Sequence, residues 1–80
     1  MSHSPTATTL LMLDSGHQAR ITGILGGRNM TRRMLALGLR VGTVINILNR
    51  RGRGIVIGNA GTRVALGAGI ADKLLVEPVD

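Results

Sequence analysis

The stretch that decides the fold is GGRNMTRRMLALGL, residues 26–39, the one clear helical pattern in a chain of short apolar runs. Asn29 is the predicted N-cap, because an asparagine side chain can accept a hydrogen bond from a free amide of the first turn. Gly38 follows the last periodic residue and suits a left-handed C-terminal cap, across which Leu39 can fold back onto Met34. The stretch therefore predicts one short helix with glycines at both ends.

The predicted helix, residues 30–37, has two different faces. At about 100° per residue, one side is an apolar stripe suited to close the end of a small barrel. That stripe consists of Met30, Met34 and Leu37. The opposite side carries Arg28, Arg32 and Leu35. A leucine between arginines is typical of an interface, because the leucine supplies apolar area and the guanidiniums attract and pair with carboxylates.

On both sides of this stretch, the sequence favours short strands divided by glycine turns. Residues 17–24 alternate, with Ala19 and Ile21 on one face, and Gly23 indicates a kink or a close backbone approach. Further strands are predicted at residues 43–49, 55–57, 62–66 and 74–77, with one helical turn at residues 70–73. Such spacing predicts an all-β fold, a small barrel of about five strands with one main helix inserted after the first long strand.

The core of this barrel is predicted to consist of aliphatic side chains and methionine, since the chain has no Phe, Tyr or Trp. The inward residues are expected to be Ile21, Ile24, Met34, Leu37, Leu39, Val44, Ile47, Ile57, Val64, Leu66, Leu74 and Val76.

The N-terminal part divides in two. Residues 1–9 are polar and predict a disordered tail ahead of a single domain at residues 10–80. Residues 10–13 are apolar and are expected to be extended and packed against the body. One hypothesis is that they cover Leu35 and make that side of the helix structural.

Composition narrows the function classes. The absence of Cys excludes disulfides and thiolate zinc sites. No run reaches the ~18 apolar residues of a membrane-spanning helix, and no signal peptide is evident, so a cytoplasmic protein is expected.

Enzymatic chemistry is poorly supported. The four carboxylates and two histidines are scattered along the chain. A catalytic site needs an acid or base, a nucleophile and an orienting group within reach of one another. We therefore predict no catalytic residue, no cofactor and no metal site in the monomer. A metal bridging two copies at His3 or His17 is left open.

The net charge of +6 favours anionic partners. A basic hairpin loop is predicted at residues 50–54, with Arg50, Arg51 and Arg53, and these could form a phosphate track with Arg63. Without aromatic residues for base stacking, only salt-sensitive and non-specific nucleic-acid binding would remain. Nucleic acid is therefore the alternative partner class.

Several motifs together resemble the ferrous iron transport protein A (FeoA) family. They are the glycine pair 26–27, RRMLALGL at residues 32–39, GTV at 42–44, TRVALG at 62–67, residues 70–71 and LLV at 74–76. The resemblance covers residues 10–76. It departs from the family in lacking a proline near Val41 and in having residues 51–54 where many members carry a longer loop.

The resemblance implies a small SH3-like barrel and a cytosolic accessory role for a FeoB-type ferrous iron transporter, a membrane protein with a GTPase domain. Similar domains lie at the C-terminus of iron-dependent repressors, so a regulatory domain is a further alternative. We hypothesise that Arg28, Arg32 and Leu35 contact the transporter, with Arg50, Arg51 and Arg53 as the next candidates. The membrane would be reached only through that partner, no specific nucleic acid is expected, and a homodimer is left open.

Overall fold

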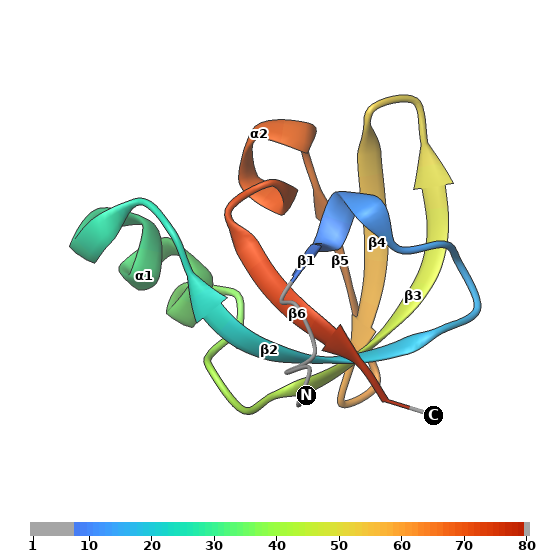
Figure 1. Cartoon of the computed structure of the whole chain (residues 1–80), viewed down its shortest axis with the longest axis horizontal. Helices are drawn as coiled ribbons and strands as arrows, with labels where there is room; N and C mark the ends of the chain where they lie inside the picture. The colour runs from blue at the N-terminus through green and yellow to red at the C-terminus, as the bar shows by residue number, and fades with distance from the viewer. Residues whose placement is uncertain (1–7, 80) are drawn as a thin grey trace, which may run out of the picture.

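The computed structural model describes residues 8–79 as one antiparallel sheet with short helices (Figure 1). Its elements are β1 (Thr8–Thr9), the 3-10 turn η1 (Leu10–Met12), β2 (Gln18–Ile24), α1 (Gly27–Ala36), β3 (Val44–Arg51), β4 (Gly54–Asn59), β5 (Thr62–Leu66), α2 (Ala68–Ala71) and β6 (Leu74–Pro78). The strand order is β1-β6-β2-β3-β4-β5. The predicted β-rich fold, with its main helix after the first long strand, is confirmed.

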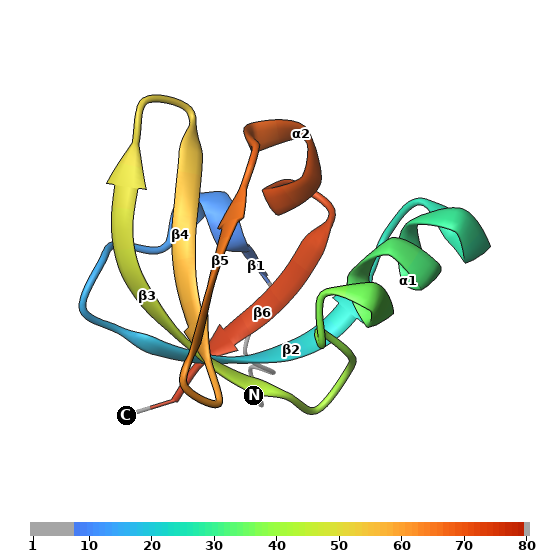
Figure 2. The same cartoon turned by 180° about the vertical axis from the view of Figure 1, so that it is seen from behind.

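The sheet curls around a single core, as expected for the small barrel that the strand pattern predicts and for the SH3-like form that the FeoA resemblance implies (Figure 2). Two irregularities in register help it to bend, one in β2 between Ile21 and Gly23 and one in β3 between Ile47 and Asn49. A β-bulge bends its strand and increases the local twist. The predicted kink at Gly23 is therefore confirmed, and its missing side chain also lets Leu75 pack closely against it.

Thirteen buried apolar residues form the core, and no polar side chain among the described residues is buried. Most of the predicted inward residues are confirmed as buried, and Ile24 and Val64 are partly buried against the core. Two were wrong: Val44 and Leu37 are exposed. Val44 lies on the outer face of β3, and Leu37 follows the last residue of a helix that stands away from the barrel. The buried residues that the prediction omitted are Leu10, Ala19, Ile45, Ile55 and Ala71.

The helix α1 starts earlier than predicted. Gly26 is its N-cap, with a left-handed φ of 98°, and no side chain caps the first turn. The prediction of Asn29 as N-cap was therefore wrong, because the glycine pair turns the chain into the helix before Asn29 is reached. At the other end the prediction is confirmed. The amide of Leu39 donates to the Met34 oxygen at 2.8 Å, and Gly38 has a φ of 80°. These features define a Schellman cap.

The N-terminal segment closes one end of the barrel. Thr8 and Thr9, which were predicted to end a disordered tail, instead pair with β6, and the rest of that predicted tail lies outside the described residues. The expected extended segment at residues 10–13 is largely a 3-10 turn. Leu10 is fully buried, and η1 packs on α2 and β6. The hypothesis that this segment covers Leu35 was therefore wrong.

The hairpins follow the glycine signals, with shifted boundaries. Arg50 and Arg51, predicted in a loop, belong to β3, and only Gly52 and Arg53 connect it to β4. They do so because strand pairing continues to the end of the arginine run. A second hairpin turn, at residues 60–61, connects β4 to β5, and the predicted C-terminal helical turn is present, although α2 begins two residues earlier than expected.

Candidate interaction surface

The helix α1 projects from the barrel instead of lying flat on it (Figures 1 and 2). Among its residues only Met34 is buried. Met34 has 0% of its surface exposed, whereas the next residue, Leu35, has 50% exposed. Because residues four and seven apart share a side of a helix, Arg28 and Arg32 lie on the same side as Leu35. We call Arg28, Arg32 and Leu35 the helix surface.

Apolar side chains continue beyond the helix surface into the turns on either side of α1. Seven large apolar side chains are exposed among residues 8–79, and four of them fall within residues 25–41. These four are Leu25, Leu35, Leu37 and Val41. Residues 25–41 thus carry more than half of the large apolar side chains that are exposed in the described part of the chain.

The charge of the same segment is entirely positive. Residues 25–41 include four arginines and no carboxylate, and all four are exposed. The one ion pair within residues 8–79 joins Arg20 and Glu77 at 3.4 Å, on the sheet. Within those residues the guanidiniums of Arg28 and Arg32 therefore have no carboxylate partner and are available to an external one.

The structure does not bring all the predicted contact residues together. The β3–β4 hairpin, which carries Arg51 and Arg53, lies at the opposite end of the molecule from α1 (Figure 1). Arg50 has a structural contact: its guanidinium donates to the backbone oxygens of Leu11 and Leu13. Arg50 therefore fastens η1 to the barrel.

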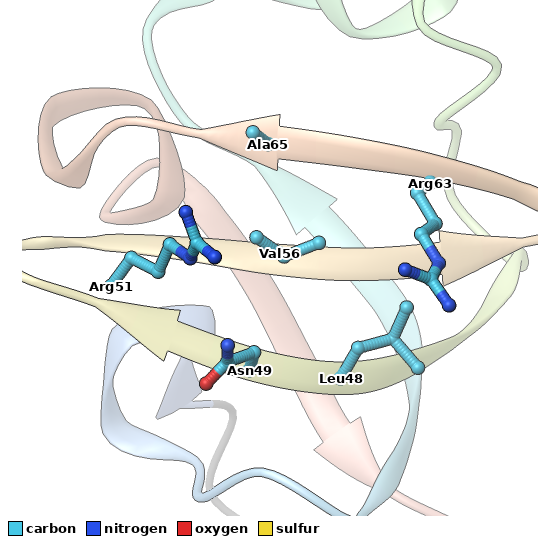
Figure 3. Close-up of a pocket in the computed structure, with 6 residues that line it drawn as sticks. All are labelled: Leu48, Asn49, Arg51, Val56, Arg63 and Ala65. Atoms are coloured by element: carbon cyan, nitrogen blue, oxygen red, sulfur yellow. The ribbon is translucent and has the colours of Figure 1, made fainter.

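Sequence reasoning missed a second feature, on the outer face of β3, β4 and β5. There an open groove of about 470 Å³ is lined by Leu48, Asn49, Arg51, Val56, Arg63 and Ala65, which we call the outer groove (Figure 3). The sequence did hold a signal for this groove. Both faces of the predicted strand at residues 43–49 carry apolar residues, and Arg63 lies on a nearby predicted strand. The prediction had considered Arg63 only as part of a phosphate track.

Between Thr8 and Val79, no three His, Cys, Asp or Glu side chains are grouped so that they could hold a metal ion. His17 is exposed in the turn before β2, and His3 lies outside the described residues. No helix within the described part of the chain is long and apolar enough to cross a bilayer.

Comparison with known proteins decides the family. The family model described as FeoA domain matches residues 8–78, nearly the full chain. The chain belongs to the FeoA domain family. The FeoA resemblance drawn from residues 26–44 and 62–76 is thereby confirmed.

Individual FeoA relatives agree in both sequence and structure. One is a Methanocaldococcus jannaschii protein provisionally named Fe(2+) transport protein A, 22% identical over 71 residues, which cover 89% of this chain and 87% of that protein. Another is the crystal structure of an iron uptake regulatory protein (FeoA). It is 30% identical, has a TM-score of 0.85, and is matched over 92% of this chain and 99% of its own.

The same fold occurs inside larger proteins. A manganese-dependent transcriptional repressor matches 96% of this FeoA domain with a TM-score of 0.85, but the match spans only 44% of the repressor chain. At 21% identity, this likeness concerns the fold alone.

Proposed function

We propose that this FeoA-domain protein is a non-enzymatic accessory of ferrous iron uptake, which works in the cytoplasm by binding the cytosolic part of a FeoB-type transporter through the helix surface. The observation that carries the proposal is the half-exposed Leu35 on a projecting helix, beside two arginines without a carboxylate partner in the described residues. The names of FeoA relatives, which refer to Fe(2+) transport and iron uptake, supply the process.

The chemistry of the helix surface suits a protein partner. Burial of Leu35 removes apolar area from water, which favours association. Arg28 and Arg32 attract acidic groups over a distance and pair with carboxylates in a planar, two-bonded geometry. A complementary surface on the transporter would therefore combine an apolar pocket with flanking Asp or Glu residues.

No reaction is assigned to the protein itself. The carboxylates are few, and the proposal needs only binding, so the purified protein is expected neither to bind nor to hydrolyse GTP. Turnover by the purified chain, with contaminants removed, would contradict this part of the proposal.

Co-purification with the cognate transporter, with and without guanine nucleotide, tests the proposal directly. Arg32→Glu is expected to weaken the complex at least about tenfold, mainly through a slower association rate, and less so at high salt. The matched control is Arg33→Glu, because this residue carries the same charge on the same helix but lies about 100° from Arg32 around the axis.

The control distinguishes a specific contact at Arg32 from a general effect of net charge. Equal losses for Arg32→Glu and Arg33→Glu would mean that only the net charge matters. Unchanged binding in Arg32→Glu would mean that the helix surface is not the contact.

A further inference from the structure

The register of β3, β4 and β5 determines which residues lie next to one another in the outer groove. On β4 the outward residues are Gly54, Val56 and Gly58, because Ile55 and Ile57 point into the core. Across the sheet, Arg51 pairs with Gly54, Ala65 pairs with Val56, and Arg63 pairs with Gly58. The groove therefore presents arginine, an apolar patch and arginine at successive outward levels, two residues apart along β4.

The spacing between the two charges follows from strand geometry. Gly54 and Gly58 are four residues apart, and a strand rises about 3.3 Å per residue, so the two arginine levels are separated by about 13 Å. Figure 3 shows both side chains reaching over β4, Arg51 from one neighbouring strand and Arg63 from the other, with Val56 between them. The apolar patch therefore lies between the two charged side chains.

The groove is open and has no internal counter-charge. Its lining contains no carboxylate, and neither Arg51 nor Arg63 has a hydrogen bond or ion pair from a side chain within residues 8–79. Leu48 packs against Gly58, since a Cβ at Gly58 would lie 3.3 Å from a methyl carbon of Leu48. Leu48 itself is 43% exposed and adds apolar area along one side.

We propose that the outer groove binds an extended acidic peptide segment with the pattern acid–x–apolar–x–acid. In an extended chain, residues two apart point to the same side and repeat the spacing of the groove. The two carboxylates would pair with Arg51 and Arg63, and the apolar side chain between them would cover Val56 and Ala65. This site is separate from the helix surface, and its test does not depend on the proposed function.

Charge and composition favour this occupant over two others. A second copy of this chain would bring its own net charge of +6 toward two arginines, which is unfavourable. A nucleic acid would find no aromatic side chain for base stacking and would meet an apolar patch between the charges.

Fluorescence anisotropy with labelled synthetic peptides tests the inference. A peptide containing Glu-Ser-Leu-Ser-Glu is expected to bind at least about tenfold more tightly than the same residues in the order Glu-Glu-Leu-Ser-Ser. Arg51→Glu and Arg63→Glu should each weaken binding of the first peptide by a similar factor. Arg33→Glu, an equal charge change on α1, should alter it less than about twofold.

Exchanging the charges of one pair between peptide and protein tests whether the peptide carboxylates pair with Arg51 and Arg63. A peptide with one terminal Glu replaced by Lys should bind Arg51→Glu or Arg63→Glu more tightly than it binds the unchanged protein. Equal binding of the ordered and rearranged peptides would overturn the proposal, as would an equal loss in Arg33→Glu. Tighter binding of single-stranded RNA than of the ordered peptide, at physiological salt, would assign the groove to nucleic acid instead.

Discussion

The barrel body and the segment 25–41 use the same aliphatic residues in opposite ways. In the body, the Ile and Leu side chains on the inner face of the curled sheet are buried in the core. In segment 25–41 only Met34 and Leu39 are buried, and four large apolar side chains face solvent. Met34 and Leu39, together with the partly buried Met30, hold the helix against the core, whereas the four exposed side chains add little to that packing. Stability and binding should therefore be separable by mutation.

The largest effect is expected at the point where the two regions join. Met34→Ala should lower the free energy of unfolding by about 3 kcal/mol. Met34 is the only buried side chain of α1, and its truncation leaves a cavity in the core. Ile57→Ala is the matched change in the body and should cost a similar amount. Urea denaturation followed by far-ultraviolet circular dichroism measures both. A cost for Met34→Ala well below 1 kcal/mol would mean that α1 is not anchored by this residue.

The next effect concerns the close packing of the sheet. A Cβ at Gly54 would lie 2.9 Å from the backbone oxygen of Leu66. Gly54→Ala should therefore destabilise the protein by about 2 kcal/mol, since backbone atoms cannot move aside cheaply. Gly69→Ala is the control, because nothing lies near its added Cβ, and its change should stay within about 0.5 kcal/mol. Equal effects at both positions would argue against the tight β4–β5 approach.

A smaller loss is expected at the C-terminal cap of α1. Gly38 has a φ of 80°, and its oxygen accepts a hydrogen bond from Asn59 at 3.1 Å. Gly38→Ala should cost about 1 kcal/mol, because an L side chain is strained in the left-handed region. Gly38→Asn should cost less, since asparagine tolerates that conformation. Thermal unfolding midpoints distinguish the two, and the reverse order would contradict the capping role.

The smallest change in stability is expected at Leu35. Leu35→Ser should cost less than about 1 kcal/mol, since the side chain is already half exposed. The same variant should lose much of its binding to the transporter, which pull-down at matched concentrations measures. If Leu35→Ser instead unfolds the domain, the helix surface is part of the core and the separation between the two regions fails.

The sequence predicts the fold well where one face is clearly apolar. In β2, Ala19 and Ile21 stand between polar neighbours, so the inward face is unambiguous. In β3 both faces carry aliphatic residues, and the choice of Val44 as inward was wrong while Ile45 is buried. Periodicity alone cannot distinguish two apolar faces. The bulge that shifts the register at Leu48 depends on pairing with β4, which no local pattern indicates.

The candidate site was also predicted only in part, because helix geometry follows from the sequence whereas strand pairing does not. The angular separation of Leu35 from Met34 depends only on helix geometry, and the exposure of Leu35 follows from it. By contrast, Arg51 and Arg63 are twelve residues apart in sequence, and only the pairing of both hairpins brings them to the same face. The hydrogen bonds from Arg50 to the backbone oxygens of Leu11 and Leu13 join still more distant segments, and charge counting could not reveal them.

The pairing of Thr8 with Val76 has a consequence for how such a domain is reused. Among residues 8–79, the first strand β1 and the last strand β6 are neighbours, so this part of the chain enters and leaves the sheet at adjacent positions. A domain with neighbouring ends can be inserted into a host loop, fused to another unit or circularly permuted without opening its core. This geometry gives a physical basis for the presence of the same barrel within much longer repressor chains. In a permuted form, the outer ends of β1 and β6 could be joined by a short linker and new ends placed at the exposed turn between Gly52 and Arg53.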